Sequence, residues 1–72
     1  MNVFEAGVPS FAALVARTAL AGMKPATPEV TLQLTREAVA QELCIPVKWL
    51  DNDEGYEPIR SVIDTVIAEA VA

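Results

Sequence analysis

The side chains with the most chemical potential form an acidic cluster in the last third of the chain. Four carboxylates fall close together: Asp51, Asp53, Glu54 and Glu57. With Gly55 in the glycine position of an EF-hand loop, the first ligand position falls on Leu50, which has no oxygen ligand. Carboxylates used for acid–base catalysis need a pocket that perturbs them, and so short a chain has too little core for a deep one. We therefore predict no metal site here and expect the cluster to attract a basic partner.

The other reactive side chains are too sparse for enzymatic chemistry. The chain has no histidine and one cysteine, Cys44, so neither a His-based triad nor an ordinary zinc site can be assembled. Cys44 has no base beside it to form a thiolate, and we expect it to be a small core residue. The three glycines are isolated and make no phosphate-binding loop. The sequence therefore predicts a protein that is not an enzyme and uses no cofactor.

The net charge of −5 on 72 residues is unevenly distributed. Acidic and basic residues balance over residues 1–48, whereas residues 49–72 carry six acids and a single base, Arg60. This asymmetry points away from the phosphates of nucleic acid and toward basic partners. The length predicts one domain, residues 1–72, with a thin core, so that self-association or a binding partner is expected.

Membrane and secretory segments are not expected. The most apolar stretch, residues 8–23, is interrupted by Arg17 and is too short to span a bilayer. The first residues include Glu5 and no early lysine or arginine, which argues against a secretory signal. Because the single cysteine cannot form an internal disulfide, we predict a soluble, cytoplasmic protein without membrane contact.

The sequence predicts three helices in the first two thirds of the chain. The first begins at Ser10 as its N-cap and ends near Gly22. A second covers about residues 36–43, with Thr35 as its cap, and a short third covers about residues 46–51. Helices are therefore the elements that position the acidic cluster.

The clearest pattern is an apolar stripe near the C-terminus. Its members recur at the three- and four-residue spacing of a helix face: Ile59, Val62, Ile63, Val66, Ile67, Ala70 and Val71. Pro58 suits the first turn of this helix, and Arg60 faces Asp64 one turn later. We expect the stripe to pack into the core, with a homodimer that pairs the Ile59–Val71 helices as the alternative.

Residues 29–34 favour an extended conformation. Apolar and polar residues alternate through this segment, which is the period of a strand. Such a strand would pair with residues 2–5 or with a second subunit. Thr27 and Pro28 are also a good helix opening, but a helix over residues 28–43 would be apolar almost all round. The predicted fold is a mostly α single domain of about four helices, with a short two-stranded β element formed by residues 2–5 and 29–34.

The segment over residues 35–53 carries the spacing of a known motif. Ala40 is a small residue four positions before Cys44, Ile45 follows as an apolar residue, and Leu50 lies in the next helix. This pattern resembles the helix-turn-helix of Cro/repressor-like regulators, in which the small residue lets the two helices cross closely. Cys44 stands at the position of the turn glycine, and Leu50 at the position that locks the second helix.

The resemblance implies a dimeric DNA-binding regulator. In that role Arg36, Lys48 and Asn52 would contact DNA. The second helix is atypically acidic for the family, because Asp51 and Asp53 would lie beside the phosphates.

The leading hypothesis is a small acidic regulatory protein that binds a basic surface of a protein partner. Trp49 is either a core residue between the helices or an exposed anchor beside an acidic rim, and Tyr56 would extend the same patch. In size and charge the chain is similar to small phage-encoded modulators and inhibitors of host transcription. The predicted protein-binding residues are Lys48, Trp49, Asp51, Asp53, Glu54 and Tyr56.

Overall fold

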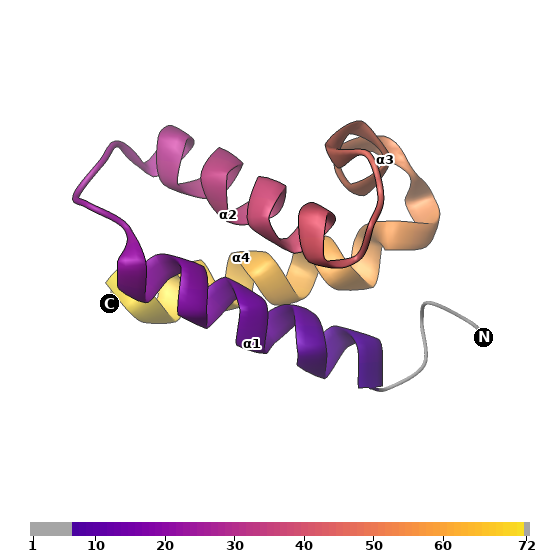
Figure 1. The fold of residues 1–72 in the computed structure, drawn as a ribbon, viewed down its shortest axis with the longest axis horizontal. Coiled ribbons are helices and arrows are strands. Elements are labelled where there is room, and N and C mark those ends of the chain that lie inside the picture. Colours follow the sequence, from indigo (N-terminus) through magenta and orange to yellow (C-terminus); the bar gives the residue numbers. More distant parts are fainter. Residues whose placement is uncertain (1–6, 72) are drawn as a thin grey trace.

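The computed structural model describes residues 7–71 (Figure 1). Its elements, in chain order, are α1 (Gly7–Gly22), α2 (Pro28–Glu42), α3 (Val47–Asn52), the short 3₁₀-helix η1 (Glu54–Tyr56) and α4 (Glu57–Val71). This small all-helical fold confirms the predicted fold class.

The three long helices pack side by side, and α3 closes one end of the bundle. In Figure 1, α1 and α4 run in the same direction, while α2 runs back over α1 in the opposite one. α1 packs against both of the other long helices, and α3 packs against α2 and the beginning of α4. The C-terminus of α2 and the N-termini of α1 and α4 therefore lie at the same end of the bundle, next to α3. The acidic last third of the chain begins at this end.

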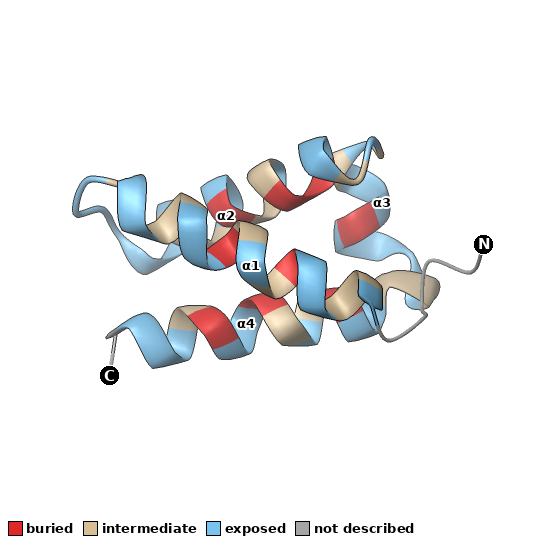
Figure 2. Ribbon diagram, turned by 60° about the horizontal axis from the view of Figure 1, so that its bottom comes forward, coloured by how far each residue is buried: buried red, intermediate tan, exposed pale blue. Residues whose placement is uncertain are grey.

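The core lies where the three long helices meet (Figure 2). α1 contributes Ala12 and Ala16, which are fully buried and small enough for α2 and α4 to approach closely. α4 contributes Ile59, Ile63 and Val66, also buried. These three members of the predicted stripe thus pack into the chain's own core, as its spacing predicted, whereas Ala70 is exposed.

Residues 29–34 form the first turns of α2, so the prediction of a strand there is wrong; residues 2–5 lie outside the described part of the chain. The helix opening prevails because the Thr27 hydroxyl oxygen accepts a hydrogen bond from the backbone N–H of Val30 at 3.3 Å, with Pro28 in the first turn. The alternation arises because Leu32 packs against the core while its neighbours Val30 and Leu34 are exposed.

Two predicted helix starts are also wrong. α1 begins at Gly7, so Ser10 lies inside the helix rather than at its N-cap. Thr35 is fully buried in the middle of α2, where its hydroxyl donates to the carbonyl oxygen of Thr31 at 2.7 Å. This bond satisfies the buried hydroxyl within its own helix, so that Thr35 is not needed as a cap.

The turn between α2 and α3 is closed by backbone hydrogen bonds. The N–H of Cys44 donates to the carbonyl of Gln41 at 3.1 Å, and that of Ile45 donates to the carbonyl of Ala40 at 3.0 Å. This pair of bonds is a Schellman motif, which requires a left-handed residue just after the helix. Cys44 fills that position with φ 59° and is exposed, so its predicted place in the core is wrong.

Candidate protein-binding surface

The candidate surface lies on α3 and η1, which are attached to the rest of the fold by contacts with the core and with α4. Leu50 is fully buried and fastens α3 to the core. Arg60, on α4, donates from Nη1 to the carbonyl oxygens of Leu50 at 2.7 Å and Asp53 at 2.8 Å. The Leu50 carbonyl lies in the last turn of α3, where carbonyls lack a partner within the helix, and the Asp53 carbonyl also accepts from the N–H of Tyr56 at 3.0 Å. α3 is only six residues long, and its contacts with Arg60 of α4 therefore help to hold the surface in place.

Trp49 is the exposed aromatic residue of this surface. Its side chain is 51% exposed although its neighbour Leu50 is completely buried. A tryptophan that plugged the contact between helices would be hidden, so the structure excludes the core interpretation of Trp49. A half-exposed indole is a large amphipathic contact surface, of the kind that anchors protein interfaces.

The acidic residues around Trp49 differ in what they contact. Asp53 and Glu54 are exposed, and the Asp53 carboxylate accepts a hydrogen bond from the N–H of Gly55 at 2.8 Å, which caps η1. Tyr56 is half-buried and packs against the core. The backbone of η1 is thereby fixed, and it holds the carboxylates of Asp53 and Glu54 at the surface beside α3.

Asp51 contributes less free charge than its neighbours because it pairs with Arg36. Arg36 Nη1 lies 3.2 Å from Asp51 Oδ1, and its Nη2 lies 3.6 Å from Asp64 Oδ1. One guanidinium thus links α2, α3 and α4, and its Nε is buried without a hydrogen-bond partner. Local spacing does not reveal this link, because it places Asp64 one turn after Arg60, and Arg60 instead contacts the backbone carbonyls of Leu50 and Asp53.

The three residues predicted to contact DNA are not equivalent in the structure. The Arg36 side chain is only 21% exposed and is held by two carboxylates. Lys48 and Asn52 are exposed on α3, where the Asn52 amide donates to the carbonyl oxygen of Lys48 at 2.9 Å. Of this set, the Lys48 ammonium is the cation that faces solvent most openly.

The surface shows no clustering suited to a metal ion. Within residues 7–71, no group of three or more Cys, Asp or Glu side chains is arranged to hold one. Over the same range, none of the helices has the length and apolar character needed to cross a membrane.

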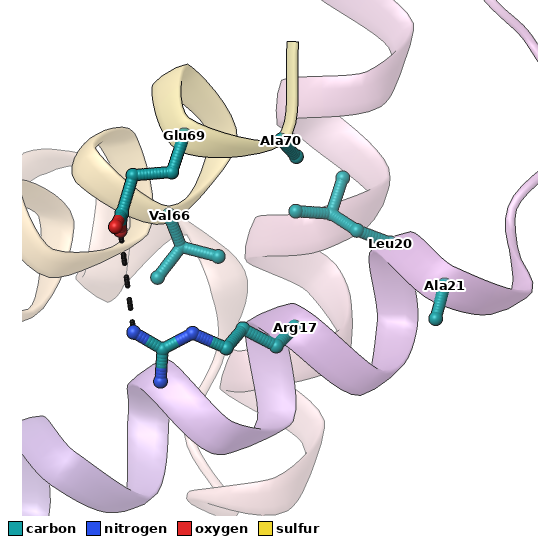
Figure 3. A pocket seen from close by; sticks show the side chains of 6 residues that line it. All are labelled: Arg17, Leu20, Ala21, Val66, Glu69 and Ala70. Atoms are coloured by element: carbon teal, nitrogen blue, oxygen red, sulfur yellow. Dashed lines mark ion pairs between the residues drawn. The ribbon is translucent and has the colours of Figure 1, made fainter. Parts of the chain in front are cut away.

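A separate hollow of about 350 Å³ lies between the C-terminal halves of α1 and α4 (Figure 3). Its walls include the apolar side chains of Leu20 and Val66, and Arg17 spans its edge toward Glu69 at 4.0 Å. This ion pair is largely exposed, and none of the residues predicted for the acidic surface or for DNA contact lines the hollow. The hollow is therefore distinct from the α3 surface.

Comparisons with known proteins give no match: no protein-family model, no curated protein and no solved structure is significantly similar to this chain. The case for function therefore depends on the chain's own residues.

Proposed function

We propose that this chain is a small, non-enzymatic regulatory protein that binds a basic surface of a protein partner through α3 and η1. The observation that carries the proposal is the half-exposed Trp49 beside exposed carboxylates. An aromatic anchor with a charged rim combines a desolvated contact with electrostatic attraction. The rim comprises Asp53 and Glu54, with Asp51 beside them partly neutralised by Arg36.

Charge indicates what the partner looks like. Residues 49–72 hold six acids against Arg60, and Arg60 is turned toward backbone carbonyls at the end of α3. A surface of this sign repels phosphates and steers basic surfaces toward it. Proteins that bind nucleic acid carry basic surfaces for its phosphates, so a component of a transcription machinery suits this site as a target. Occupying its basic surface would inhibit it by excluding nucleic acid, as a phage-type modulator of host transcription would.

The test uses Trp49 as its own reporter, since it is the one tryptophan of the chain. Titration with a lysine- and arginine-rich peptide should change the fluorescence of Trp49, and the apparent affinity should fall as salt rises. The double variant Asp53→Lys/Glu54→Lys should weaken binding at least tenfold, because it reverses the rim of the surface.

The matched control is Glu42→Lys/Glu69→Lys, which changes the net charge by the same amount at exposed positions on other elements. This control should bind within about threefold of wild type, since attraction to total charge at a distance is screened at physiological salt. Equal losses in the two double variants would show that only net charge matters, and would reject α3 and η1 as the binding surface.

The alternative function is a dimeric helix-turn-helix DNA-binding regulator. The turn between α2 and α3 favours it. Cys44 has the left-handed conformation that a turn glycine would have, and the small residue Ala40, four positions earlier, is buried. Against it stand the pairing of Arg36 with Asp51 and the acidic residues that follow α3.

A gel-shift titration with mixed-sequence DNA separates the two functions. The regulatory-protein proposal expects no binding at physiological salt, because Lys48 is the main exposed cation on α3. Tight, salt-dependent binding that weakens in Lys48→Ala would support the DNA-binding alternative and contradict the protein-only proposal.

A further inference from the structure

The outer face of α1 and α2 exposes large apolar side chains far from the acidic surface. Within residues 7–71, four of the five exposed large hydrophobic side chains lie on these two helices: Phe11, Leu14, Val30 and Leu34. On α2, Val30, Leu34 and Ala38 follow one another at four-residue spacing and so form one row. We name this surface, Phe11 and Leu14 with that row, the α1/α2 face.

A groove runs between the two helices on this face. It has a volume of about 410 Å³; its walls are Phe11, Leu14, Val15, Thr18 and Ala19 from α1, and Ala38, Gln41 and Glu42 from α2. Leu34 lies one turn before Ala38 and continues the α2 wall. Leu14 is the most exposed of the large side chains, at 60%. The same face therefore presents a protruding leucine and a hollow.

The charge of this face narrows the choice of occupant. Among the described residues that line the groove, Glu42, at its end, is the one that carries a charge. A basic partner gains little here, because the other described carboxylates lie on α3, η1 and α4 or, for Glu29 and Glu37, on the side of α2 that faces α3. A second copy of the chain, also at −5, must keep its acidic residues apart, and a face whose groove carries a single carboxylate at its end is where two such chains meet with little repulsion.

The exposed apolar area is that of a weak dimer and not of a permanent one. Phe11, Leu14, Val30 and Leu34 are exposed by 42%, 60%, 45% and 44%. This leaves roughly 300–400 Å² of apolar surface per chain, since a phenylalanine carries about 150–250 Å² and the aliphatic side chains carry less. Two facing copies bring together roughly 600–800 Å², which is in the range of weak, transient interfaces, below about 1,200 Å².

A two-fold pairing also satisfies the shape of the face. In a symmetric dimer the same patch occurs on both sides, so a protrusion on one copy must find a hollow on the other. Leu14 and the adjoining groove supply both on one surface, and antiparallel α1 and α2 laid on their symmetry mates give a four-helix arrangement. The core of the single chain is thin, and several of its buried residues are alanines. Burial of the α1/α2 face in a dimer would therefore add stability.

We propose that the α1/α2 face pairs with the same face of a second copy of the chain, in a weak homodimer. The dimer leaves α3 and η1 free on each copy, so it does not depend on the function of the acidic surface. Because the apolar area is small, we expect weak association, with dissociation at micromolar concentrations.

Sedimentation velocity over a concentration series tests the proposal. Wild type should shift from monomer to dimer within the micromolar range. Leu14→Glu and, separately, Leu34→Glu should each weaken association at least tenfold, because each places an unpaired charge in an apolar contact of the dimer. Leu14→Glu should keep the wild-type circular dichroism spectrum, since that side chain is mostly exposed in the monomer.

Trp49→Ser is the matched control, because it removes an exposed large apolar side chain from a different surface. It should associate as wild type does. A wild-type chain that stays monomeric to millimolar concentration overturns the proposal, as does a dimer that persists in both glutamate variants or is lost in Trp49→Ser.

Discussion

The α1/α2 face and the α3–η1 surface are built from the same small fold but differ in almost every physical respect. The first is a wide, nearly uncharged surface on two long helices, whose exposed side chains are aliphatic or phenyl groups. The second stands on a six-residue helix, centres on one indole and carries carboxylates. The net charge of the chain thus does not describe the α1/α2 face, and two surfaces of different chemistry can serve two kinds of contact.

The two regions also differ in how their leucines are used, and the largest predicted effect follows from this. Leu50→Ala should destabilise the fold by about 2–4 kcal/mol, because Leu50 is fully buried and its removal leaves a cavity under α3. Leu14→Ala should change stability by no more than about 0.5 kcal/mol in dilute solution, since Leu14 is mostly exposed. Urea denaturation followed by circular dichroism measures both, and similar losses would contradict the assignment of Leu14 to a surface.

A smaller effect is expected from the arginine under the acidic surface. Arg60→Met should cost about 1–2 kcal/mol, because it removes two short bonds to the carbonyls of Leu50 and Asp53. Amide hydrogen exchange should then speed up in α3 and η1 more than in α1.

The control for this prediction is Arg17→Met, which removes an exposed pair with Glu69 at 4.0 Å. Its effect should stay below about 0.5 kcal/mol, as for other solvent-screened ion pairs. Unchanged exchange in α3 of the Arg60 variant would mean that Leu50 alone holds this helix.

The smallest predicted effect concerns the turn that joins the two regions. Cys44→Gly should stabilise the fold by about 0.5–1 kcal/mol, because glycine adopts the left-handed conformation at φ 59° without the strain of a Cβ atom. Cys44→Ala should give no such gain, since it keeps the Cβ atom. Thermal unfolding should show a rise of about 3–6 °C for the glycine variant alone; equal melting temperatures for both variants would argue against strain at this turn.

The sequence predicted the parts of the fold in which one signal dominates. The stripe through Ile59, Ile63 and Val66 has a single helical period and a single buried face, so its helix and its place in the core are both confirmed. The strand prediction for residues 29–34 failed because α2 has apolar side chains on two faces, one in the core and one at the surface. Together the two faces place apolar residues at every second position, as in a strand. The wrong prediction therefore arises from the exposed row of Val30 and Leu34.

The contacts beneath the candidate surface could not be predicted from local spacing. Arg36 meets Asp51 and Asp64, which are 15 and 28 positions away in the sequence, only because α2, α3 and α4 converge. The choice of Arg60 for carbonyls over Asp64 follows from the unsatisfied end of α3, which a helix wheel does not show. The exposure of Trp49 likewise depends on how the short helix is rotated by the burial of Leu50.

The central claim is that self-association and partner binding use separate surfaces, and sedimentation velocity with and without a lysine- and arginine-rich peptide tests it most directly. Leu14→Glu should sediment as a monomer and still bind the peptide with wild-type affinity. Asp53→Lys/Glu54→Lys should self-associate like wild type and lose the peptide. A folded variant in which either change abolishes both interactions would contradict the account, because it would show one shared surface instead of two.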